Sequence, residues 1–128
     1  MQENKKILIV EDEEALRRIL VEFLRSETAW EVFEAGDGEE ALELIRKVSP
    51  DLALLDIAMP KMDGLTLAKK MMEEELTEKT KIIFLTNSAE LSSISSVSSP
   101  AVMGYLVKSN IDMREVIERI TEALTENS

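Results

Sequence analysis

The fold is decided by the stretch KILIVEDEEALRRILVEFLRSE, residues 6–27. It begins with a continuous apolar run, Ile7–Val10, and passes through four acids, Glu11–Glu14, into a segment with apolar residues at helical spacing. The apolar face of this expected helix consists of Ala15, Leu16, Ile19, Leu20, Phe23 and Leu24. A continuous apolar run indicates a parallel strand covered on both faces, and the amphipathic segment indicates its crossover helix. The stretch therefore predicts the first strand–helix unit of an α/β protein.

The same alternation recurs along the rest of the chain. Further strands are expected at 30–35, 52–55, 82–85 and 102–107, and further helices at 41–48, 65–76 and 113–124. Between Ser88 and Pro100 seven of thirteen residues are serine, which predicts a weak additional helix because serine has a low helix propensity. Five strands alternating with helices predict a parallel sheet with helices on both faces.

Length and composition narrow the class of protein. The 128 residues are expected to form a single domain, 1–128, and no apolar stretch approaches the length of a membrane span. A formal charge of −11 argues against direct nucleic-acid binding and against docking on anionic membranes. The chain has no cysteine and no histidine, which excludes disulfides, thiolate metal sites and histidine-based triads. We expect a cytoplasmic domain whose chemistry depends on oxygen ligands.

Polar residues follow four of the expected strands at the edge where such sheets bind ligands. They are Glu11 and Asp12 after the first strand, Asp56 after the third, Thr86 after the fourth and Lys108 after the fifth. Three of them have a structural alternative: Asp12 could cap a helix, Thr86 could be an ordinary strand-end hydroxyl, and Lys108 could be solvated. Their coincidence at one edge is the signal for a functional site.

Three carboxylates beside one lysine have a definite chemistry. Like charges this close repel one another unless a cation intervenes. Oxygen-only ligands favour Mg²⁺, which takes one or two carboxylates together with phosphoryl oxygens. With Lys108 and Thr86 as further contacts for a phosphoryl group, the set predicts phosphoryl transfer to a carboxylate, and Asp56 is the natural nucleophile.

These residues also resemble a known family. The segments that carry the resemblance are Val10–Glu14, Leu54–Gly64 (LLDIAMPKMDG), Leu85-Thr86 and Gly104–Lys108 (GYLVK). Together they are similar to the receiver domain of two-component response regulators, in order, at the right spacings and over essentially the whole chain.

The resemblance implies a fold, a switch and a set of roles. The fold would be a five-stranded parallel sheet of order 2-1-3-4-5 with five helices. Asp56 would accept a phosphoryl group from a phosphohistidine of a sensor histidine kinase or phosphotransfer protein. Mg²⁺ would be held by Asp12, Asp56 and the backbone carbonyl of Ala58, with Glu11 acting through water. Thr86 and Lys108 would bind the phosphoryl oxygens, and Tyr105 would swing inward as Thr86 moves.

The output would be a change of partners on the face made by the fourth helix, the fifth strand and the fifth helix. A phosphorylation-dependent homodimer is one form that this output could take. The domain would be a signalling switch and not an enzyme, since it would catalyse only its own phosphorylation and dephosphorylation.

Two positions depart from the family pattern. Ser109 follows Lys108 where the family usually has a proline after a cis bond, and we expect a trans bond here. Asn87 stands after Thr86 in place of a small residue.

Other classes fit less well. A haloacid-dehalogenase-type phosphatase needs an aspartate at position 58, where the chain has Ala58. In a flavodoxin, the four acids of the first loop would repel the bound phosphate. A nucleotide-binding protein would need a glycine-rich loop, and the chain has none. An EF-hand would need alternating calcium ligands, and the chain lacks them. The remaining alternative is a receiver-like adaptor that binds partners without phosphorylation.

Overall fold

The computed structural model describes residues 4–125 and contains one parallel sheet in the order β2-β1-β3-β4-β5. The strands are β1 (Lys6–Val10), β2 (Glu31–Ala35), β3 (Leu52–Asp56), β4 (Lys81–Thr86) and β5 (Val102–Val107). The α-helices are α1 (Glu14–Glu27), α2 (Gly38–Val48), α3 (Gly64–Glu73) and α4 (Met113–Thr125). Three 3₁₀ segments complete the described chain: η1 (Leu76–Glu78), η2 (Ser88–Ser96) and η3 (Lys108–Asn110). The expected strands and their order are confirmed.

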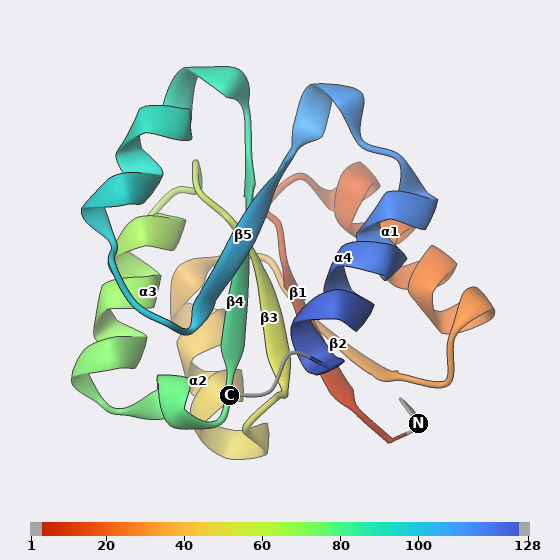
Figure 1. Cartoon of the computed structure of the whole chain (residues 1–128), viewed down its shortest axis with the longest axis horizontal. Coiled ribbons are helices and arrows are strands. Elements are labelled where there is room, and N and C mark those ends of the chain that lie inside the picture. The colour runs from red at the N-terminus through yellow and green to blue at the C-terminus, as the bar shows by residue number, and fades with distance from the viewer. Residues whose placement is uncertain (1–3, 126–128) are drawn as a thin grey trace.

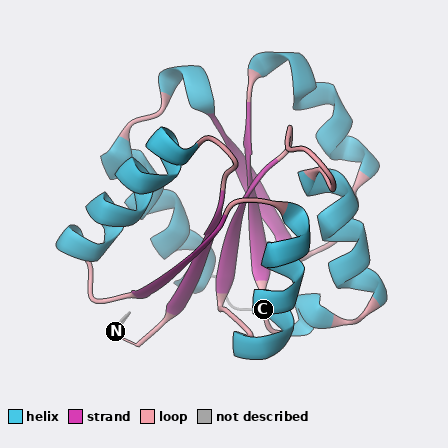
Figure 2. Ribbon diagram, turned by 180° about the vertical axis from the view of Figure 1, so that it is seen from behind, coloured by secondary structure: helices cyan, strands magenta, loops and turns pink. Residues whose placement is uncertain are grey.

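Helices cover both faces of the sheet, as the continuous apolar strands require. Helices α1 and α4 lie on one face, and α2 and α3 lie on the other (Figure 1), so the sheet forms the middle layer (Figure 2). Successive residues of β1 point to opposite layers. Leu8 and Val10 belong to the core beneath α2 and α3, whereas Ile7 and Ile9 belong to the core beneath α1 and α4.

Helix α1 packs through Leu20 and Leu24 as expected, but one flank of its buried face differs from the prediction. Val21 is buried together with Leu20 and Leu24, whereas Ile19 is 53% exposed. Residues 19 and 21 flank Leu20 on opposite sides of the helix, so the apolar pattern alone admits either of them. One turn before Val21, Arg17 forms an ion pair with Glu34 of β2 at 3.0 Å. This contact fixes the Arg17–Val21 side of the helix against the sheet.

The serine-rich segment forms a 3₁₀ helix, so the described residues contain four α-helices and the expected count of five is corrected. Two of its serines bond to the local backbone: Oγ of Ser95 donates to the Ser92 carbonyl at 3.0 Å, and Oγ of Ser96 donates to the Ser93 carbonyl at 2.7 Å. Such bonds compete with regular helical hydrogen bonding. The following Val97 is buried in the core beneath α2 and α3 and anchors the segment.

All five strands run in the same direction, so their carboxyl ends meet at one edge of the sheet. The loops after β1, β3, β4 and β5 therefore lie close together although they are far apart in the sequence. Among residues 4–125, no helix combines the length and the apolar character that a membrane crossing requires.

Candidate functional site

Three charged side chains meet at the carboxyl edge of the sheet. Glu11 follows β1, Asp56 is the last residue of β3, and Lys108 follows β5. The Lys108 ammonium lies 3.1 Å from Oε1 of Glu11 and 3.2 Å from Oδ1 of Asp56. Both carboxylates are almost completely buried, with 0% and 1% exposure, so these are close contacts in a region with little water. The solvated-lysine alternative for Lys108 is thereby wrong.

The β1–α1 loop holds Glu11 at several atoms. Its backbone N–H donates to the Ala35 carbonyl at 3.2 Å, which extends the pairing of β1 with β2. Its carboxylate accepts a hydrogen bond from the Glu13 N–H at 2.9 Å. Helix α1 has Glu13 at its N-cap position, with no capping hydrogen bond from that side chain, so the expected alternative of Asp12 as the cap is wrong. Asp12 is exposed beside the buried pair.

The surroundings of Asp56 make its charged form unfavourable. Burial, the negative charge of Glu11 and the nearby Asp12 carboxyl raise the pKa of Asp56 from 3.8 to about 8, although Lys108 opposes this shift. Burial by itself lowers the pKa of the Lys108 ammonium, but the adjacent Glu11 and Asp56 carboxylates outweigh it and leave that pKa raised. The single Lys108 ammonium therefore does not balance the negative charge of the three carboxylates.

The donor set fits a hard divalent cation. Glu11, Asp12 and Asp56 each offer a carboxylate oxygen, and these oxygens all lie within 4.8 Å of one another. Oδ2 of Asp56 is buried, and no group that the structure describes donates a hydrogen bond to it. A buried carboxylate oxygen without a donor, in an all-oxygen cluster with excess negative charge, matches what Mg²⁺ binds.

The other expected site residues lie at the same edge or next to it. Thr86 ends β4, is fully buried and donates from Oγ1 to the Asn87 carbonyl at 2.8 Å. Ala58 lies in the exposed part of the loop after β3. Tyr105, on the edge strand β5, is 42% exposed. The Lys108–Ser109 bond is trans, as expected, since none of the peptide bonds between residues 4 and 125 is cis.

Gly64 has a role that its sequence context did not reveal. Asp63-Gly64 reads as a turn before a helix, and Asp63 does cap α3 by accepting from the Thr66 N–H at 2.8 Å. Beyond this, a Cβ atom on Gly64 would lie 2.3 Å from the backbone oxygen of Asp56. The absence of a side chain at Gly64 thus lets the start of α3 pack directly on the backbone of Asp56. The signal for this in the sequence is the position of Gly64 at the end of the LLDIAMPKMDG segment that also contains Asp56.

The fold and the carboxyl edge of its sheet define an α/β protein with a site that suits a cation together with the anionic oxygens of a ligand. The family model of the response regulator receiver domain matches residues 7–121, and the chain belongs to this family. It is accordingly a receiver domain of two-component signalling, a family whose members switch by phosphorylation. Response regulators receive their phosphoryl groups from histidine kinases, and receiver domains bind Mg²⁺ at their acidic pocket.

Individual relatives agree with this assignment. Sporulation initiation phosphotransferase F of Bacillus subtilis is 32% identical over 121 residues, covering 94% of both chains. The crystal structure of the response regulator TrrA from Thermotoga maritima, in complex with Mg²⁺–BeF, superposes with a TM-score of 0.79 at 36% identity, covering 93% of this chain and 98% of that one.

Longer relatives match only in part. Protein-glutamate methylesterase/protein-glutamine glutaminase 1 of Hahella chejuensis is 37% identical over 88% of this chain, and transcriptional regulatory protein PdtaR of Mycobacterium tuberculosis is 36% identical over 81% of it. The chain matches 31% of the first relative's length and 49% of the second's.

Proposed function

We propose that this chain accepts a phosphoryl group onto Asp56 from a phosphohistidine donor, with Mg²⁺ as cofactor, and thereby changes its binding partners. The observation that carries the proposal is the environment of Asp56. Its carboxylate is buried at the carboxyl edge of the sheet, 3.2 Å from the Lys108 ammonium and beside Glu11 and Asp12. A nucleophile so placed can react with a phosphoryl group whose negative charge is neutralised from two sides.

The transfer is a single displacement at phosphorus. A carboxylate oxygen of Asp56 attacks the phosphorus, the bond from phosphorus to the donor imidazole nitrogen breaks, and the electron pair leaves with the imidazole. The ammonium of Lys108 pairs with a phosphoryl oxygen, and the Thr86 hydroxyl donates to another. Because Lys108 contacts Asp56 in the unmodified protein, it is already close to the reacting carboxylate.

Asp12, Asp56 and the backbone carbonyl of Ala58 are the proposed ligands of Mg²⁺, with Glu11 acting through water. The ion, when bound, neutralises the charge that develops on the phosphoryl oxygens. Glu11 has two further tasks: it accepts from the Glu13 N–H and holds Lys108 within reach of Asp56.

The proposed output face consists of η2, β5 and α4. Movement of Thr86 toward the phosphoryl group would let Tyr105, exposed on the neighbouring strand, swing inward and change this face. The partners on either side of this switch are a histidine kinase or phosphotransfer protein as donor and an output protein, a second copy of the phosphorylated chain included.

The relatives support this proposal within limits. The TrrA structure contains Mg²⁺–BeF, and the Bacillus subtilis relative is named a phosphotransferase. The methylesterase activity of the longer relative is named for a protein of which this chain matches 31%. We therefore propose a signalling switch with no reaction of its own beyond its phosphorylation and dephosphorylation.

Acetyl phosphate with Mg²⁺ tests the proposal directly. The chain should gain the mass of one phosphoryl group, and this gain should disappear in Asp56→Asn and in the presence of EDTA. The matched control is Asp51→Asn, which changes an aspartate at the opposite end of β3. If neither acetyl phosphate nor beryllofluoride changes the wild-type protein, the chain is a receiver-like adaptor that works without phosphorylation.

A further inference from the structure

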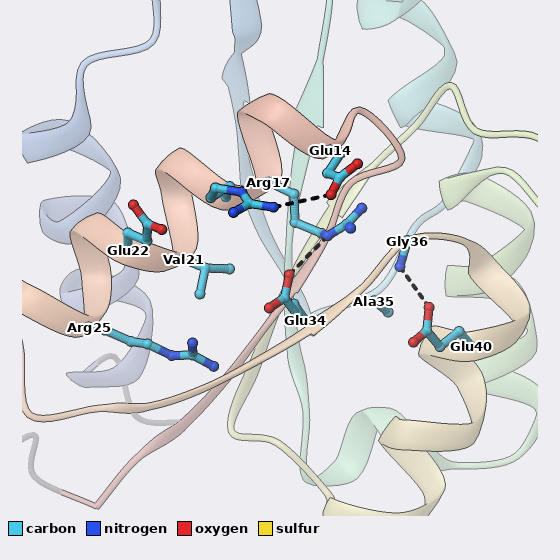
Figure 3. Close-up of a pocket in the computed structure, with 10 residues that line it drawn as sticks. Glu14, Arg17, Val21, Glu22, Arg25, Glu34, Ala35, Gly36 and Glu40 are labelled. Atoms are coloured by element: carbon cyan, nitrogen blue, oxygen red, sulfur yellow. Dashed lines mark hydrogen bonds and ion pairs between the residues drawn. The ribbon is translucent and has the colours of Figure 1, made fainter.

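A polar cavity of about 450 Å³ lies between α1 and the β2–α2 region (Figure 3). Arginines of α1 line it together with glutamates of both regions. One of these arginines connects the cavity to the acidic site. Nη1 of Arg17 donates to the backbone carbonyl of Glu11 at 2.8 Å, and Nε of Arg17 pairs with Oε1 of Glu34 at 3.0 Å.

The Glu11 carbonyl belongs to the peptide group that joins Glu11 to Asp12. The structure fixes the other polar groups of Glu11 separately, through the Ala35 carbonyl, the Glu13 N–H and the Lys108 ammonium. The contact from Arg17 is therefore the one that sets the tilt of the peptide leading into Asp12. Rotation of this peptide would move the Asp12 Cα and, with it, the direction of its carboxylate.

We propose that Arg17 is a positioning residue of the acidic site, which orients the Glu11–Asp12 peptide so that Asp12 can bind Mg²⁺. This inference rests on the proposed function, because it needs the cation site to exist. Arg17 itself touches neither the cation site nor the reacting carboxylate of Asp56 in the contacts described, so it acts through the backbone.

The surroundings of Arg17 are built to hold it in one place. Its side chain is 19% exposed. A Cβ atom on Gly36 would lie 3.1 Å from Nη1 of Arg17, so the absence of a side chain there leaves room for the guanidinium. The N–H of Gly36 donates to Oε1 of Glu40 at 2.9 Å, which fixes the turn beside it (Figure 3). Glu34 supplies a negative charge next to the guanidinium, so its positive charge is balanced locally and competes little with a cation.

Arginine suits this position because it donates in two directions at once. The rigid fork of the guanidinium reaches the Glu11 carbonyl through one nitrogen and Glu34 through another. Groups that orient metal ligands without touching the metal commonly change metal affinity by about 10–100-fold. For a contact made through one backbone carbonyl we expect the lower end of this range.

The alternative is that Arg17 merely fastens α1 to β2, and the chain contains a matched control for it. Arg25, two turns further along α1, donates from Nη2 to the Val32 carbonyl of β2 at 2.8 Å. Arg25→Ala therefore removes a contact between the same helix and strand that is similar in length to the 3.0 Å pair of Arg17 with Glu34, but it lies away from Glu11.

The experiment measures Mg²⁺ affinity calorimetrically on the unphosphorylated full chain, and stability by urea unfolding in EDTA. Arg17→Ala is expected to weaken Mg²⁺ binding about tenfold, whereas Arg25→Ala changes it less than about twofold despite a similar loss of stability. The nitrogen resonance of the Asp12 amide, which shares its peptide group with the Glu11 carbonyl, should shift in Arg17→Ala and stay in place in Arg25→Ala. If Arg17→Ala does not fold, Glu34→Ala tests the contact of Arg17 with the Glu11 carbonyl indirectly, because it removes the ion pair that holds the guanidinium in place. Weaker Mg²⁺ binding and a shifted Asp12 resonance are again expected.

Two results would overturn the inference. One is Mg²⁺ affinity in the Arg17 variant, or in Glu34→Ala where that replaces it, within twofold of wild type. The other is equal weakening in Arg25→Ala. A wild-type chain that binds no Mg²⁺ would instead refute the proposed cation site itself, so the two failures are distinguishable.

Discussion

Asp56→Asn should make the metal-free protein more stable, and the gain should depend on pH. The pKa of the buried Asp56 carboxyl is about 8, against 3.8 for an ordinary aspartate. Since the folded-state pKa lies above the unfolded one, the contribution of this carboxyl to stability is fully present below about pH 4. It is lost as the pH rises from about 4 through about 8, because the unfolded chain releases the Asp56 proton in this range while the folded protein retains it.

The magnitude follows from the width of this window. Each pH unit between the two pKa values corresponds to about 1.4 kcal/mol, so at pH 7 the ionisable carboxyl costs the wild type up to roughly 4 kcal/mol. Asparagine is nearly the same shape as the neutral acid, and its side-chain oxygen can still accept from Lys108. We expect Asp56→Asn to gain about 2–4 kcal/mol near pH 7 and less than about 0.5 kcal/mol near pH 4.

Urea unfolding in EDTA can measure this difference across the pH range. The single tryptophan, Trp30, is buried in the core beneath α1 and α4, so its fluorescence reports unfolding. The comparison between wild type and variant cancels the titration of the acids that do not interact with Asp56. Adding Mg²⁺ should stabilise the wild type much more than the variant, because the bound ion offsets the buried charge.

A control of opposite sign is available at Asp37. Its carboxylate caps α2 by accepting from the Glu40 N–H at 2.9 Å, and this bond holds the pKa of Asp37 below its usual range. Asp37→Asn should therefore lose stability above about pH 4, and the loss should fade as the pH falls through the lowered pKa. If Asp56→Asn is no more stable than the wild type at pH 7, or its gain is the same at pH 4 and 7, the reasoning about buried charge is refuted.

Three further predictions concern metal binding, phosphoryl lifetime and local stability. Asp12→Ala should weaken Mg²⁺ binding about tenfold or more while the domain stays folded; calorimetry within twofold of wild type would mean that the metal site is misplaced. Phospho-Asp56 should last many minutes, because the Ala58 side chain offers no polar group to orient water and because we expect Asn87, larger than the usual small residue, to crowd its approach. Ala58→Asn should shorten the measured lifetime, and a longer lifetime in Asn87→Ala would show that Asn87 assists hydrolysis. In hydrogen exchange, the amides of residues 92–97 should exchange well before those of residues 117–124, because serine side chains compete for the backbone hydrogen bonds of η2. Equal protection of the two segments would contradict this prediction.

Much of the fold was predictable because the strands are buried on both faces. The run Ile7–Val10 leaves no polar position for solvent, and the structure divides these residues between the two cores. The amphipathic segments predicted α1, α2, α3 and α4, because a helix that covers a sheet buries one apolar face and exposes the other. The serine-rich segment was harder, because its propensity is low and side-chain bonds such as that from Ser96 to the Ser93 carbonyl decide between helix types.

The candidate site was predictable in its members but not in its arrangement. Glu11, Asp56 and Lys108 could be singled out because each follows a predicted parallel strand, and parallel strands end at a common edge. Their contacts depend on loops whose course the local sequence does not dictate. Arg17 is not part of the apolar face predicted for α1, and its bond to the Glu11 carbonyl depends on the docking of α1 with Val21 inward.

The sequence by itself determined which residues are strands, which edge carries the acids and which family the motifs resemble, because these follow from local periodicity and from motif spacing. The tertiary structure decided what no local pattern contains. It places the Lys108 ammonium between two carboxylates 97 and 52 residues away, and it brings Gly64 against the backbone of Asp56. It also raises the pKa of Asp56 to about 8, since burial and neighbouring charge are properties of the packed protein. Long-range contacts and the exclusion of water arise only when the chain has folded, and they turn a row of acids into a candidate site.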